Sequence, residues 1–100
     1  MKEFDYFGYK DNLFKEAKHP YEHYTFKFAN DFGASVLRFT PKQLWELAVL
    51  WFDGNDDYLS TSTHITNDVV YCLTDNEVSA LLKEISELDL DGRKKDGRQQ

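Results

Sequence analysis

Hydrophobic and polar side chains alternate from Tyr21 to Phe28, the pattern of a half-buried strand. Residues 24, 26 and 28 are aromatic and fall on one side, with polar residues on the other. Residues 29–33 include Asn, Asp and Gly, which tolerate turn conformations, and Ala34–Phe39 is again rich in β-formers. The pattern predicts an antiparallel hairpin.

The most apolar segment, Lys42–Phe52, fits two patterns. Leu44, Leu47, Ala48 and Trp51 would share a helical face, whereas Trp45, Leu47, Val49 and Trp51 would share a strand face. We predict a strand, because Trp, Val and Phe gather near its end and a polar loop, 53–57, follows directly. Thr40-Pro41 predicts a corner or a short helical turn before it, and Tyr58–Thr63 predicts a fourth strand.

The strongest local signal is a capping box, Thr74-Asp75-Asn76-Glu77, which predicts the start of a helix. The apolar residues behind it recur at the spacing of one helical face: Val78, Leu81, Leu82, Ile85 and Leu88. For the preceding segment, Ile65–Leu73, we predict a single helical turn.

These elements predict an α+β fold, in which an antiparallel β-meander of about four strands packs against a C-terminal α-helix. The α+β domain would span residues 21–89, and the polar tail 90–100 would be disordered. An aromatic-rich segment, residues 1–20, would pack on the domain. If the helix covers only one face of the sheet, some of the aromatics of this segment must cover the other face or remain exposed: Phe4, Tyr6, Phe7 and Tyr9. Asp11-Asn12 would turn a small hairpin or open a short helix; the sequence leaves both alternatives open.

Composition fits one folded domain. The chain has 100 residues, of which 41% are hydrophobic and 16% aromatic, enough for a packed core. No apolar run reaches the length of a membrane span, and residues 1–9 mix charges with aromatics, which is unlike a signal peptide. We therefore expect a cytoplasmic protein. The single cysteine, Cys72, lies in an apolar stretch and is predicted to be a small buried hydrophobe.

The net charge of −6 is unevenly distributed. Residues 1–43 hold six acids and seven bases, residues 44–89 hold ten acids and one base, and residues 90–100 hold two acids and four bases. An acidic middle disfavours direct nucleic-acid binding and favours a partner with a basic surface. The residues predicted to bind that partner are Asp53, Asp56, Asp57, Asp68, Asp75, Glu84 and Glu87.

No catalytic, cofactor-binding or metal-binding residues are predicted. A calcium loop starting at Asp53 fails, because Tyr58 stands where glycine is needed and His64 where the bidentate glutamate is needed. The three histidines lack zinc-site spacing, and the glycines never cluster into a phosphate loop. Ser60, His64 and Asp68 lack the context of a nucleophile elbow. Trp45 and Trp51 are predicted to be core residues, and the basic residues of the tail are predicted to be solubilising.

Several segments, in this order, resemble a family of small uncharacterised proteins encoded by phages and prophages of Gram-positive bacteria. They are Gly33–Val36 with Arg38, Leu44–Leu50 with Phe52–Gly54, Ile65–Val69, and Leu73-Thr74. The resemblance covers residues 22–88 and brings no activity or site with it. It implies an accessory role in a bacterial host cell.

The leading hypothesis is a non-enzymatic phage or prophage protein that binds a host protein stoichiometrically through an acidic surface. The hypothesis includes an inhibitor of host defence, such as an anti-CRISPR protein, as one form of this binder. An alternative is a homo-oligomer, a structural or assembly protein that self-associates through a strand edge or an aromatic patch. A small hydrolase or nuclease is the least favoured alternative, because the sequence shows no clustered polar groups for it. Neither a membrane nor a cofactor is predicted.

Overall fold

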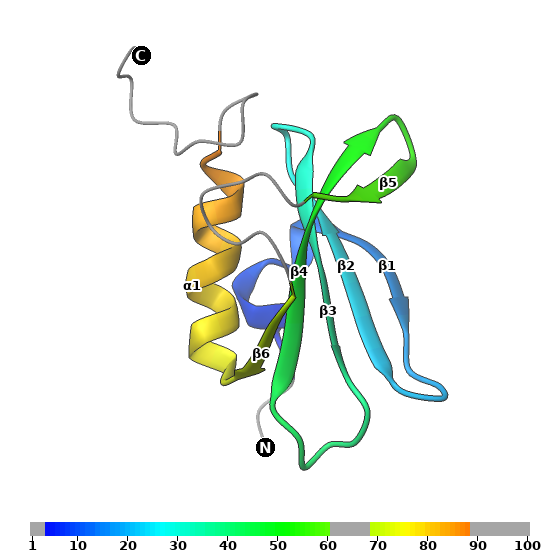
Figure 1. Cartoon of the computed structure of the whole chain (residues 1–100), viewed down its shortest axis with the longest axis vertical. Coiled ribbons are helices and arrows are strands. Elements are labelled where there is room, and N and C mark those ends of the chain that lie inside the picture. Colours follow the sequence, from blue (N-terminus) through cyan, green and yellow to red (C-terminus); the bar gives the residue numbers. More distant parts are fainter. Residues whose placement is uncertain (1–3, 61–68, 89–100) are drawn as a thin grey trace.

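A single antiparallel sheet and one helix make up the part of the chain that the computed structural model describes, residues 4–60 and 69–88 (Figure 1). The strands are β1 (Leu13–Ala17), β2 (Glu22–Lys27), β3 (Phe32–Arg38), β4 (Trp45–Asp53), β5 (Asp56–Leu59) and β6 (Val70–Leu73). The helix is α1 (Asp75–Ser86), and two 3-10 turns, η1 (Tyr6–Gly8) and η2 (Lys10–Asn12), precede β1.

The strand order β1-β2-β3-β4-β5 is a meander, as predicted, but the described residues form six strands instead of about four. One of the additional strands is β6. It pairs with the first residues of β4, and β5 pairs with the last residues, so β5 and β6 share one edge of this long strand. The other extra strand is β1, which begins directly after η2 and which the sequence pattern did not predict.

Most of the predicted elements are present with shifted ends. Of the ambiguous segment 42–52, residues 45–52 are a strand and residues 42–44 belong to the preceding turn. The capping box is present, with Thr74 Oγ1 accepting from the Glu77 amide and Glu77 Oε1 accepting from the Thr74 amide. The prediction of a helical turn is wrong for residues 70–73, because they form β6, with Val70 opposite Leu47. Residues 65–68, 61–63 of the predicted fourth strand, and the predicted disordered tail lie outside the described residues.

The main core lies between one face of the sheet and α1. The sheet contributes Tyr24, Phe26, Ala34, Val36, Trp45, Leu47 and Val49, and the helix contributes Val78, Leu82 and Ile85, followed by Leu88. The Phe7 ring of η1 packs edge-on against Trp45, with 5.0 Å between centroids, and edge-on against Phe26. The N-terminal segment therefore joins the helix on its own side of the sheet (Figure 1). Of the two alternatives for its aromatics, covering the opposite face is wrong, whereas Phe4 remains exposed.

The sheet curves strongly, and the face opposite α1 lies on the inside of the curve. In a flat sheet, neighbouring strands about 4.8 Å apart would put β1 and β4 about 14 Å apart. The rings of Phe14 from β1 and Phe52 from β4 nevertheless lie 5.3 Å apart, and Lys15 Nζ lies 3.5 Å from Asp57 Oδ2 of β5. The sheet is thus a half-barrel with a small aromatic cluster inside the curve.

Gly33 permits this curl. A Cβ atom at this position would lie 1.9 Å from the Phe26 carbonyl oxygen and 2.7 Å from Cε1 of Phe52. Both distances are far below van der Waals contact, so only a residue without a side chain fits between β2 and the Phe52 ring.

The helix is fastened to the sheet by Asn30, in the turn between β2 and β3. Its Nδ2 donates to the carbonyl oxygens of Ile85 (2.9 Å) and Leu88 (2.8 Å), and its Oδ1 accepts from the Phe32 amide (3.0 Å). Ile85 lies in the last turn of α1 and Leu88 follows the helix, so a single side chain from the β2–β3 turn holds the C-terminal end of the helix against the sheet.

Two predicted core residues are exposed. Trp45 is buried as predicted, but the Trp51 side chain remains 43% exposed. Cys72 is exposed as well, because it occupies a bulge in β6 with a φ of 62°.

Within the described residues, no helix is long and apolar enough to cross a membrane.

Candidate binding surface

The β4–β5 hairpin carries an exposed pair of aromatic rings. Trp51 and Tyr58 stand directly opposite each other in the strand register, with 4.9 Å between ring centroids and 28° between ring planes. Their side chains are 43% and 47% exposed. Exposed Trp and Tyr are the residues most often found at the centre of protein interfaces.

The path of α1 explains why this pair is uncovered. Trp51 lies on the same face of β4 as Trp45 and Val49, which are buried. The C-terminal end of α1 is held by Asn30, next to Phe32 of β3, which pairs with Trp51. The helix therefore extends as far as Trp51 but packs mainly on β3, so the end of β4 remains uncovered.

Two carboxylates lie beside the aromatic pair. Asp53 and Asp56 face each other across the two-residue turn, in which Gly54 has a φ of 65°. Since side chains alternate along a strand, both lie on the face that bears Trp51 and Tyr58. Like charges directly opposite each other destabilise a sheet by about 0.2–1 kcal/mol. Neither aspartate has an ion-pair partner among the described residues.

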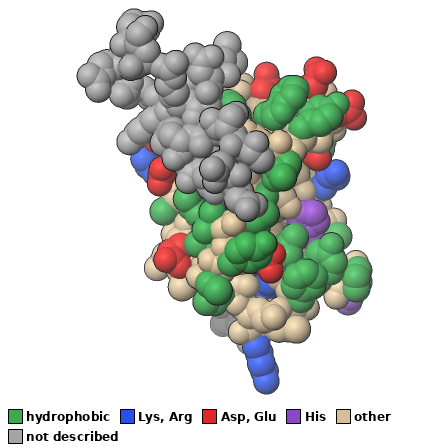
Figure 2. Space-filling view, in the orientation of Figure 1, with side chains coloured by type: hydrophobic (Ala, Val, Ile, Leu, Met, Phe, Trp, Pro, Cys, Tyr) green, Lys and Arg blue, Asp and Glu red, His purple; other side chains and the backbone are tan. Residues whose placement is uncertain are grey.

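The opposite face of the hairpin is fixed to the rest of the sheet. Asp57 pairs with Lys15, and Lys27 Nζ donates to the Gly54 carbonyl oxygen at 3.0 Å. The Lys27 ammonium also lies 5.4 Å from the ring centroid of Phe52, which is buried. The cations near the hairpin thus belong to its other face. In Figure 2, hydrophobic side chains flanked by carboxylates gather at the end of the molecule where Figure 1 places this hairpin.

Six of the seven predicted partner-binding residues are divided between the hairpin and the helix. Asp53 and Asp56 come together on one face of the hairpin, and Asp57 lies on its other face. Glu84 lies in the last turn of α1 and Glu87 caps its end, where Glu87 Oε2 accepts from Lys83 Nζ at 3.0 Å. Asp75 is the first residue of α1, at the end of the helix that lies away from the hairpin (Figure 1). Asp68 lies outside the described residues.

Asp75 has a role inside the fold. Its Oδ1 accepts a hydrogen bond of 2.7 Å from Nε1 of Trp45, which is only 1% exposed. Burying an indole without satisfying its N–H would be unfavourable, so this carboxylate stabilises the core. It also lies in the first turn of α1, where a negative charge is favourable.

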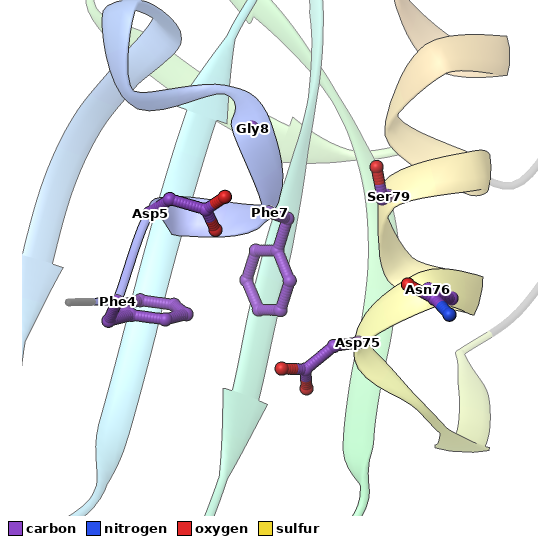
Figure 3. Close-up of a pocket in the computed structure, with 7 residues that line it drawn as sticks. All are labelled: Phe4, Asp5, Phe7, Gly8, Asp75, Asn76 and Ser79. Carbon is purple, nitrogen blue, oxygen red and sulfur yellow. The ribbon is translucent and has the colours of Figure 1, made fainter. Parts of the chain in front are cut away.

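A hollow of about 520 Å³ separates the N-terminal segment from the start of α1 (Figure 3). Its lining consists of Phe4, Asp5, Phe7, Gly8, Asp75, Asn76 and Ser79. Aromatic rings form one wall and polar side chains of the helix form the other. Among the described residues, no buried side-chain polar atom lacks a hydrogen-bond partner, so nothing in this lining requires a ligand.

A serine–histidine pair lies on the curled face. His23 Nε2 and Ser35 Oγ are 2.6 Å apart, and the pKa of His23 lies below its usual value because of burial and the nearby Lys15 charge, which outweigh the effect of Asp57. A neutral imidazole can act as a base. Ser35, however, sits in the middle of the sheet, paired with Thr25 on one side and Ala48 on the other.

Acyl transfer needs free N–H donors for the oxyanion, and the strands around Ser35 use theirs in the ladder. We interpret the two residues as a cross-strand pair. Over the described ranges, no group of three His, Cys, Asp or Glu side chains has the arrangement of a metal site.

The sequence prediction identified the acidic residues of the hairpin but not its aromatic pair. The sequence predicts Trp51 as a core residue and Tyr58 only as part of the fourth strand. Whether α1 covers Trp51 depends on the path of the helix across the sheet, for which the sequence carries no local signal. In the comparisons with known proteins, no family model, no curated protein and no solved structure matches the chain.

Proposed function

We propose that the protein is a non-enzymatic, stoichiometric binder that engages a basic protein surface with its β4–β5 hairpin. The observation that carries the proposal is the exposed Trp51–Tyr58 stack beside two carboxylates, Asp53 and Asp56, that lack ion-pair partners among the described residues.

Aromatic area and charge have separate roles in such a surface. Large, rigid rings lose little conformational entropy when they are buried, and they dominate the binding energy of many interfaces. Carboxylates attract a basic partner over a distance, and they raise the association rate and its dependence on salt. The net charge of −6 adds to this attraction.

The proposed biological setting follows from the sequence resemblance. A phage or prophage protein in the bacterial cytoplasm would meet host proteins that handle nucleic acid, and these expose basic surfaces. Occupying such a surface would inhibit the host protein, as an anti-CRISPR protein does. The acidic hairpin supports this proposal through its charge.

The test is affinity capture from a bacterial host lysate with three forms of the tagged protein at low and moderate salt. The forms are the wild type, Asp53→Asn/Asp56→Asn, and a control, Asp11→Asn/Glu84→Gln, which changes the net charge equally. Asp11 and Glu84 are exposed, and neither side chain makes a hydrogen bond or ion pair among the described residues.

We expect one basic protein to be captured by the wild type and the control and lost from the hairpin variant. Equal loss from both variants would mean a response to net charge alone and would refute a hairpin site. Absence of any captured protein would favour the second candidate, self-association.

Self-association is favoured by a different surface. Leu44 and Tyr71, which are 50% and 60% exposed, line a shallow hollow together with Cys72 beside the edge strand β6. A mass that rises with protein concentration, and that Tyr71→Ser returns to the monomer value, would support this candidate.

A further inference from the structure

We infer that the hairpin recognises the guanidinium group of arginine in preference to the ammonium group of lysine. The inference rests on the proposed function and specifies which basic side chain the partner presents.

The ring geometry favours a flat cation. The rings of Trp51 and Tyr58 are stacked with 28° between their planes, so their inner faces cover each other and a cation would stack on an outer face of the pair. Each of the two residues is more than two-fifths exposed. Guanidinium is planar and weakly hydrated, so it stacks on such a surface at little desolvation cost. An ammonium group is compact and strongly hydrated, and gains less from the same contact.

The protein itself contains the arrangement that we propose. The Arg38 guanidinium carbon lies 4.2 Å from the ring centroid of Trp45, and Arg38 Nε forms an ion pair with Glu22 Oε1. The arginine thus contacts the tryptophan ring and pairs with the carboxylate at the same time. By contrast, the closest lysine contact of this kind, Lys27 over Phe52, is longer, at 5.4 Å.

The hairpin presents the same two kinds of group, an indole and a carboxylate, without an arginine beside them. Trp51 supplies the indole, and Asp53 and Asp56 supply carboxylates on the same face. A guanidinium on the ring can donate two hydrogen bonds to one carboxylate while its charge offsets the repulsion between the pair. Lysine would neutralise the charge equally but would provide neither the planar stacking nor the fork of donors.

The experiment compares two synthetic peptides of equal charge, one with three arginines spaced by Gly-Ser and the other with three lysines in the same positions. Binding is followed by the two tryptophan indole N–H resonances in ¹⁵N NMR spectra, assigned with Trp51→Phe. The buried Trp45 indole, held by Asp75, serves as an internal reference.

We expect the arginine peptide to shift the Trp51 indole resonance and to bind at least about fivefold more tightly than the lysine peptide. Asp53→Asn/Asp56→Asn should reduce that difference, and Asp11→Asn/Glu84→Gln should leave it unchanged. Equal affinities would overturn the arginine preference while the proposed function stands. If neither peptide shifts Trp51, both the preference and the hairpin site are wrong.

Discussion

Replacing Asn30 by aspartate is a nearly isosteric change that we expect to be strongly destabilising. Asn30 Nδ2 donates to the Ile85 and Leu88 carbonyls, and aspartate would turn both donated hydrogen bonds into contacts between oxygens. Two lost hydrogen bonds account for about 2 kcal/mol. A negative charge at the C-terminal end of α1 adds about 0.3–1 kcal/mol. The total, about 3 kcal/mol, corresponds to a fall in Tm on the order of 10–20 °C for a domain of this size.

The same geometry gives the aspartate variant a characteristic pH dependence. The carbonyls raise the folded-state pKa of residue 30, because only the protonated carboxyl can donate to them. The penalty is therefore full above the raised pKa and fades as the pH falls toward the unfolded value of about 3.9. Asn30→Ala loses all three hydrogen bonds of the side chain but has no such titration.

Urea unfolding of wild type, Asn30→Asp and Asn30→Ala, followed by circular dichroism, measures these differences at neutral pH and at about pH 5. The gap between the aspartate variant and the wild type should narrow on acidification, and the gap for the alanine variant should stay constant. An aspartate variant within about 0.5 kcal/mol of the wild type at neutral pH would show that Asn30 does not fasten the helix.

Four further predictions concern other parts of the fold. Gly33→Ala should abolish the half-barrel or cost at least about 3 kcal/mol in unfolding free energy, since its Cβ would lie 1.9 Å from a β2 carbonyl oxygen; a soluble variant with unchanged Tm would contradict this. The pKa of His23 is lowered from 6.5 by burial first, so its contribution to stability should be lost as the pH falls below 6.5, and His23→Gln should flatten that part of the pH profile of stability. Asp56→Asn should raise the unfolding free energy by about 0.2–1 kcal/mol while weakening capture of the partner; lower stability would argue against repulsion in the hairpin. Asp75→Ala should reduce stability by about 1–3 kcal/mol through the lost Trp45 hydrogen bond, with capture of the partner unchanged.

The fold could be predicted where local pattern and tertiary packing agree. The alternation in β2 and β3 and the capping box of α1 are local signals, and the core uses them directly. Strands β1 and β6 carry weaker signals. β1 is an edge strand whose register shifts at Phe14, and β6 is a four-residue strand with a bulge at Cys72. Their pairing depends on neighbours far along the chain, which periodicity within a short window cannot show.

Of the proposed binding surface, only the charge could be predicted from the sequence. Asp53 and Asp56 stand close together in the sequence, so their proximity needed no structure. The exposure of Trp51 depends on α1 packing mainly on β3 instead of on the end of β4, and the role of Asp75 depends on a contact with Trp45, 30 residues away. Both are properties of the assembled layers and not of any single segment.

The exposed thiol of Cys72 has a practical consequence for every experiment above. As the chain's single cysteine, it can be conjugated with a maleimide dye at one defined position on β6, away from the β4–β5 hairpin (Figure 1). The same thiol can join two molecules by an intermolecular disulfide in air. Masses measured without reductant would then include a covalent dimer, and Cys72→Ser is the background in which self-association should be measured.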